Sequence, residues 1–334
     1  MAILWCGGED IDFPNGTLVA VSTVSTNFRA GYARCSIQQQ TQGGMAKGIP
    51  FPGGAVTSAW VTWRALSTNA NNITQRMFGF GLSGTVKGLF VGTDSATASK
   101  LALCKYDGTT TTQLASETGT SWGINVIHRF DMNLVSYGAS ATVTVYLDGA
   151  SIISFSGDVT VSGVTNVDSI FMGGSNVNVA SDPQFSEIVV ADEDTRSFPG
   201  LVTMAPNGAG TTTNWTNNAF TNLNGTTISD AQPVSSNTNA QLQEYNLIDL
   251  PTGTFVIKAV MIVARMAKSQ SPGVTQVELG YNSGGSVAYG TGATKALTTG
   301  YTTYNQLDSI NPVTGVAWVQ ADMNGLQIDM QALT

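Results

Sequence analysis

Charged side chains are scarce in this sequence. They make up 11% of the 334 residues, against about 25% in a typical soluble protein. A polar but weakly charged surface suits a protein packed into a larger assembly or facing neutral ligands better than a dissolved metabolic enzyme. Basic residues number 14 and acidic residues 22, for a net charge of -8. Phosphate binding needs clustered Lys and Arg, and the basic residues here are scattered, so we expect no nucleic-acid partner.

Histidine and cysteine are almost absent, which excludes much metal and nucleophile chemistry. The single histidine, His128, leaves no histidine pair for zinc. Strand alternation makes it a solvated or hydrogen-bonded surface residue, and no Gly-x-Ser-x-Gly elbow supplies a nucleophile beside it. Cys6, Cys35 and Cys104 are odd in number and widely spaced. They are predicted to be buried thiols of a reducing compartment, not metal ligands or a disulfide framework.

Long apolar runs are also lacking. The first ten residues have neither the basic region nor the apolar core of a secretory signal. The most apolar stretch, residues 255–266, contains Lys258 and Arg265 and is too short to span a bilayer. We therefore expect a soluble, unprocessed chain without membrane insertion.

Strand periodicity is abundant instead. Alternating β-branched residues at 141–147, the turn Asp148-Gly149 and an apolar run at 152–155 predict a β-hairpin. Further short strands are predicted at residues 18–24, 32–38, 59–66, 76–82, 89–93, 100–106, 125–134, 169–173 and 185–191. Many short strands separated by turn clusters are typical of a sandwich or jelly roll.

The second half shows the same strand character after a change in composition. A break at residues 197–200 precedes a Gly, Thr and Asn-rich segment at 207–214, which we interpret as a loop. A long strand is predicted at 254–268, with both faces covered because its middle is almost wholly apolar. Other predicted strands are 276–281, 300–307 and 315–321, and residues 322–332 form either a strand or a short helix.

Paired carboxylates would indicate catalysis, because some sandwich enzymes hydrolyse glycosides with two acidic residues. The acidic clusters lie at residues 9–12 and 192–194, and neither matches the Glu-x-Asp-x-x-Glu pattern of lectin-like glycosidases. We interpret both as solvated turn carboxylates, with calcium binding by Asp192 and Asp194 as the alternative. The sequence thus predicts no catalytic, cofactor-binding or metal-binding residue.

Two tryptophans, Trp60 and Trp63, lie three apart on one predicted strand. Their side chains therefore point to opposite faces of the sheet. One is expected in the core, and the other is free to stack on a sugar ring or on a neighbouring subunit.

Certain segments resemble known families. The Val-Tyr-Leu-Asp-Gly hairpin at 145–149 and residues 185–192 resemble a concanavalin A-like (laminin-G-like) lectin or glucanase domain. Residues 192–196, 206–210, 311–318 and 322–328, together with Trp215, are similar in order and spacing to bacteriophage virion proteins. The resemblance implies an all-β chain, with a concanavalin A-like jelly-roll sandwich at residues 1–198 and a smaller β-sandwich assembly domain at 199–334. It transfers no catalytic residues.

These observations give a main functional hypothesis and two alternatives. The main hypothesis is a non-enzymatic virion structural protein on the phage tail tip, fibre or capsid surface, assembled in the bacterial host cytoplasm. Its partners would be other virion proteins and further copies of itself, most plausibly as a trimer. The first alternative is a carbohydrate-binding protein that recognises a host-surface glycan. The second is a glycoside hydrolase.

Overall fold

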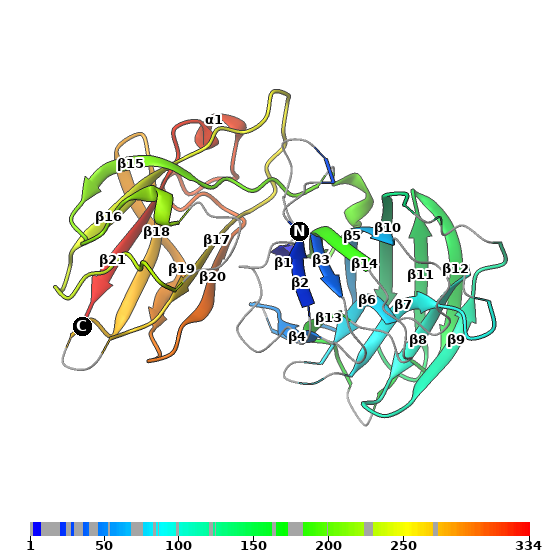
Figure 1. The fold of residues 1–334 in the computed structure, drawn as a ribbon. Coiled ribbons are helices and arrows are strands. Elements are labelled where there is room, and N and C mark those ends of the chain that lie inside the picture. The colour runs from blue at the N-terminus through cyan, green and yellow to red at the C-terminus, as the bar shows by residue number, and fades with distance from the viewer. Residues whose placement is uncertain are drawn as a thin grey trace. The chain divides into compact units, whose positions relative to one another are not determined.

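The fold of the chain is known from a computed structural model (Figure 1). It describes residues 3–7, 21–24, 28–29, 36–39, 46–52, 54–67, 76–82, 85, 87–97, 100–119, 123, 125–161, 165–172, 183–198, 200–223, 230–269 and 273–334. The described residues form two compact units, the first ending at Leu201 and the second beginning at Val202. The sequence prediction placed this division after residue 198.

Unit 1 consists of two antiparallel sheets. The first contains β1 (Ile3–Gly7), β2 (Val21–Val24), β3 (Ser36–Gln39), β5 (Ala59–Ser67), β10 (His128–Val135), β11 (Ala141–Leu147), β12 (Ala150–Gly157) and β14 (Pro183–Ala191). The second contains β4 (Ala46–Pro50), β6 (Arg76–Gly81), β7 (Gly88–Thr93), β8 (Leu101–Tyr106), β9 (Thr111–Ser116) and β13 (Ser169–Met172). The first sheet has the order β12-β11-β10-β5-β14-β3-β2, with β1 paired to β14, and the second has the order β4-β13-β6-β7-β8-β9.

The predicted hairpin is confirmed at β11 and β12. Residues of β11 alternate between buried and more exposed, as strand geometry requires. Asp148 and Gly149 both have positive φ, 49° and 87°, which is the backbone of a type I′ turn. The Asp-Gly pair therefore sets the register of the hairpin.

Aromatic packing joins the two sheets of unit 1. Trp63 of β5 is fully buried and stacks on Phe130 of β10 with ring centroids 5.0 Å apart. The same indole lies 5.0 Å from the ring of Phe78, which belongs to β6 in the other sheet. Trp60 points to the opposite face of β5 and is only partly buried, as the spacing predicted. The predicted all-β, jelly-roll class is confirmed.

Unit 2 is a smaller β structure. Its larger sheet contains β15 (Pro206–Thr213), β16 (Leu242–Leu247), β18 (Gln276–Ser283), β19 (Ser286–Ala296) and β21 (Gln327–Leu333), in the order β15-β16-β21-β18-β19. A separate antiparallel pair is formed by β17 (Val260–Met266) and β20 (Thr302–Asp308). The core between them includes Tyr245, Ile262, Tyr281 and Trp318, and the short helix α1 (Gln320–Met323) contributes Met323 to it.

Three predictions for unit 2 are corrected by the structure. The long strand at 254–268 is wrong in extent and burial: β17 begins at Val260, and in it only Ile262 is fully buried. A turn around Gly253 precedes it, and Val256 is 77% exposed, so apolar character did not mean burial. The loop predicted at 207–214 is strand β15, whose backbone pairs with β16. The strand predicted at 315–321 is a turn followed by α1, because Gly315 adopts a φ of +72°.

The structure describes two of the three cysteines. Cys6 and Cys104 are buried, as predicted; Cys35 and the acidic cluster at 9–12 lie outside the described residues. No helix in the described part of the chain has the length and apolar character needed to cross a membrane.

Candidate functional site

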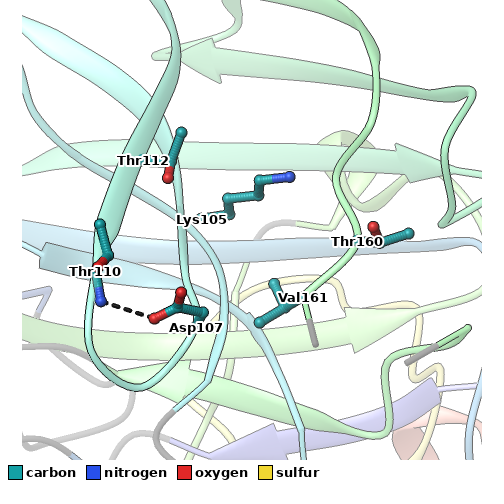
Figure 2. A pocket seen from close by; sticks show the side chains of 6 residues that line it. All are labelled: Lys105, Asp107, Thr110, Thr112, Thr160 and Val161. Atoms are coloured by element: carbon teal, nitrogen blue, oxygen red, sulfur yellow. Dashed lines mark hydrogen bonds between the residues drawn. The ribbon is translucent and has the colours of Figure 1, made fainter. Parts of the chain in front are cut away.

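A polar pocket of about 210 Å³ lies at the edge of unit 1 (Figure 2). Lys105 of β8 pairs with Leu89 of β7, and Leu89 pairs with Phe80 of β6. Side chains at paired positions share a face, and Phe78, two residues before Phe80, faces Trp63 of the first sheet. Lys105 therefore stands on the inner face of its sheet, where the sandwich opens.

The β8–β9 hairpin supplies one wall of this pocket. Lys105 lies opposite Thr112 in the strand pairing, and Thr110 lies two residues from Thr112 on the same face. Asp107 begins the connecting turn, and its Oδ1 accepts hydrogen bonds from the backbone N–H groups of Thr109 (2.8 Å) and Thr110 (2.7 Å). Figure 2 shows that the second carboxylate oxygen of Asp107 lies away from the hydrogen bond between Asp107 and Thr110.

The segment that follows β12 supplies the opposite wall, through Thr160 and Val161. Val161 is 2% exposed and lies at the base of this wall, while the Thr160 hydroxyl donates to Asp158 Oδ1 at 2.6 Å. An ion pair between Lys105 Nζ and Asp158 Oδ2, 3.2 Å apart, ties this segment to β8. The pocket therefore joins two segments about fifty residues apart in sequence.

Both carboxylates at this site are held in the ionised state. Hydrogen bonds from the Thr160 hydroxyl and backbone, together with Lys105, lower the pKa of Asp158 to about 2. Backbone hydrogen bonds from Thr110 and Thr109 lower the pKa of Asp107. The pocket thus presents fixed acceptors, threonine hydroxyls that both donate and accept, and a methyl-bearing wall.

Sequence reasoning missed this site. It recognised the Asp107-Gly108 pair as a turn but did not predict β9, since exposed threonines hide strand periodicity. The available signal was the run of threonines at 109–112, whose alternate members must share one face. Nothing local in the sequence connects that run with Thr160.

The partly buried tryptophan predicted to be available for stacking is covered within the chain. Trp60 and Tyr146 are near-parallel, with centroids 5.9 Å apart, and the Arg196 guanidinium lies over both rings at 5.1 Å and 4.4 Å. Both carboxylate oxygens of Asp194 accept hydrogen bonds from that guanidinium, and the pKa of Asp194 is lowered by the hydrogen bond from Arg196. The carboxylate considered for calcium is therefore engaged with a cation of the protein, and its neighbour Asp192 is exposed.

His128 is a hydrogen-bonded strand residue, as predicted, but it does not lie on the surface. It is 8% exposed, because it begins β10 beneath the hairpin turn. Its Nδ1 lies 2.7 Å from Asp148 Oδ2, and the backbone N–H of Gly123 donates to Nε2 at 3.4 Å. Both ring nitrogens thus have structural partners, which explains the residue as part of the turn.

A second group of polar residues lies on one face of the larger sheet in unit 2. The strand pairings align Glu244, Asp329, Gly280 and Tyr289 in one row across four strands. A Cβ at Gly280 would lie 2.5 Å from the Tyr289 ring, so glycine lets that ring cross the sheet. The Tyr289 hydroxyl then donates to Asp329 Oδ1 at 2.6 Å.

The two carboxylates of this row have different environments. Glu244 receives hydrogen bonds from Asn282 Nδ2 and the Thr212 backbone N–H, both at 2.6 Å. Asp329 is fully buried, and its Oδ2 has no hydrogen-bond partner. Burial, with repulsion from Glu244 and Glu278, raises the pKa of Asp329 to about 6, although the Tyr289 hydrogen bond opposes this.

No set of acidic, cysteine or histidine residues in the described parts of the chain is arranged to hold a metal ion. No protein-family model and no curated protein matches the sequence. Similar solved structures include a sialidase of Trypanosoma rangeli, with 14% identity over 54% of this chain and a TM-score of 0.35. The chain spans only 29% of that sialidase.

Two smaller proteins are also similar. Alginate lyase Aly36B matches 55% of this chain and 99% of its own, with 9% identity and a TM-score of 0.36. The carbohydrate-binding module CBM66 from Bacillus subtilis matches 51% of this chain and 94% of its own, with 11% identity and a TM-score of 0.33. The sialidase and the lyase are enzymes, which overturns our sequence-based exclusion of catalytic activity. That exclusion is withdrawn.

Proposed function

We propose that this chain is a carbohydrate-binding protein and that the pocket of unit 1 is where it holds a sugar. The observation that carries the proposal is the pocket lining: three threonines, a lysine and an aspartate against one valine. Sugars present hydroxyl groups that both donate and accept hydrogen bonds, on rings with apolar C–H faces. Threonine hydroxyls and a fixed carboxylate complement the first feature.

The size of the pocket supports one sugar unit within a longer chain. Its volume of about 210 Å³ is below the roughly 300–1,000 Å³ typical of sites that enclose a drug-sized ligand. The pocket also opens at the edge of the sandwich, so further units can extend over the surface. We therefore expect weak binding of single sugars and tighter binding of oligosaccharides.

The test is a titration of the full chain with oligosaccharides chosen from a glycan array. Thr112→Val removes one hydroxyl from the pocket at nearly constant shape and should weaken binding about five-fold, as expected for one neutral hydrogen bond. Thr142→Val is the matched control, because Thr142 is an exposed strand residue of β11 outside the pocket lining.

Equal losses in the two variants, or no loss in either, would contradict the assignment of this pocket. A chain that binds nothing on a broad array would contradict the proposed function itself. Mass analysis of each bound glycan after incubation also reports whether the chain cleaves what it binds.

The place of the protein on a phage particle stays a prediction drawn from sequence resemblance. Glycan binding is compatible with such a place, but the proposal stands on the pocket alone.

A further inference from the structure

We infer that the pocket of unit 1 accepts neutral sugar units and rejects acidic ones. This inference rests on the proposed function and concerns the ligand class of the same site. It follows from which charges line the pocket and which of them already have partners.

Lys105 is the one cation among the described residues of the pocket lining, and its charge is already neutralised. Lys105 Nζ lies 3.2 Å from Asp158 Oδ2 and 3.4 Å from the Asp158 backbone oxygen. The carboxylate of Asp158 is additionally fixed by two hydrogen bonds from Thr160, at 2.6 Å and 2.8 Å. An incoming anion would therefore have to compete with a carboxylate that the protein holds in place.

The uncommitted acceptor at the pocket belongs to a second carboxylate. Asp107 uses Oδ1 to bind the turn, and Figure 2 shows its side chain beside Thr110 at the pocket wall. Its other oxygen is suited to accept a hydrogen bond from a sugar hydroxyl. A sugar carboxylate at the same point would meet like charge at short range, which is unfavourable even with solvent screening.

Lys87 does not reverse this balance. It lies outside the pocket lining and beside the turn, where a Cβ at Gly108 would be 3.4 Å from Lys87 Cε. There it contributes to stabilising the Asp107 carboxylate. The ammonium group of Lys105 is thus paired, and the charge of Lys87 acts on the Asp107 carboxylate.

The experiment uses pairs of oligosaccharides that differ only at the terminal unit, a hexose in one and the corresponding hexuronic acid in the other. The full chain should bind each neutral member at least about ten-fold more tightly than its acidic partner, measured by calorimetry at moderate salt. Equal or tighter binding of the acidic members would overturn the inference while leaving glycan binding intact. Failure to bind either series would instead remove the proposed function, and the inference with it.

Two variants sharpen the comparison. Asp158→Asn releases Lys105 from its ion pair, so the preference for the neutral member should narrow to about two-fold. Asp158 is about half exposed, so the fold should tolerate this change. Asp192→Asn changes an exposed carboxylate of unit 1 outside the pocket and should leave the preference unaltered. An unchanged preference in Asp158→Asn would overturn the role assigned to Lys105.

Discussion

Replacing Asp329 with Asn should stabilise unit 2 at neutral pH. The Asp329 side chain is fully buried with Oδ2 unpartnered, and its pKa is about 6 in the folded protein against the ordinary value of 3.8. The folded state therefore binds a proton that the unfolded state has already released. Stability from this residue is fully present below about pH 4 and is lost as pH rises through 6. The full loss is at most about 3 kcal/mol, from a shift of about two pKa units.

The assay is urea unfolding of the full chain at about pH 5 and about pH 7.5. Both pH values are above the sequence pI of about 4.5. Across that interval the wild type should lose about 1.4 kcal/mol relative to Asp329→Asn. Taking the difference between the two proteins cancels the titrating groups that do not interact with Asp329. The asparagine keeps an oxygen that can accept the Tyr289 hydroxyl hydrogen bond seen in the structure.

Two further variants test the cause. Tyr289→Phe removes a hydrogen bond that stabilises the Asp329 carboxylate, so it should increase the pH dependence. Asp249→Asn alters an exposed aspartate of the same unit and should leave the pH dependence as in the wild type. If Asp329→Asn is less stable than the wild type at about pH 7.5, the surrounding protein stabilises the buried carboxylate. That result would refute the reasoning.

Other expected outcomes follow from individual contacts. Trp63→Ala should cost about 3–5 kcal/mol of unfolding free energy because the indole fills the core. Trp60→Ala should cost no more than about 2 kcal/mol. Comparable losses of the two variants in urea unfolding would contradict the assignment of the two side chains to opposite faces of β5. His128→Ala should cost about 1–2 kcal/mol, the range for a buried hydrogen bond, without changing glycan affinity in calorimetry. Limited proteolysis should cut within residues 201–205 and leave two resistant fragments, since the preceding segment is bound to unit 1; cleavage only at the termini would count against two units. Mass measurement of the intact protein should show a symmetric homo-oligomer, and a strict monomer at micromolar concentration would refute that expectation.

The fold class could be predicted because it depends on local patterns. Alternation at 141–147 and the Asp148-Gly149 turn determine the hairpin without reference to the rest of the chain. The spacing of Trp60 and Trp63 likewise determined that they face opposite sides of β5. Failures came where tertiary context overrode the pattern. The apolar residues before β17 are partly exposed, and the Gly and Thr-rich segment after residue 206 became a paired strand.

Neither polar cluster could be predicted, because each depends on strand register. The pocket needs Lys105 and Thr112 opposite each other and Thr160 brought across from β12. The row in unit 2 needs Asp329 aligned with Glu244 on one side and Gly280 on the other. A carboxylate in a strand looks the same in sequence whether it is solvated or buried. Acidic clusters in the sequence consist of neighbours along the chain, whereas Glu244 and Asp329 are neighbours only across strands.

Several charged side chains of unit 1 are paired inside the fold. Glu187 has a side chain 1% exposed and binds both Arg29 and Arg64. Asp131 is equally buried, and its partner Arg129 also donates to backbone oxygens of the segment after β14. Such buried pairs cannot attract a ligand from solution, so the outer surface is less charged than the composition alone implies. The threonine-lined pocket that we propose as the sugar site offers short-range hydrogen bonds from hydroxyl groups.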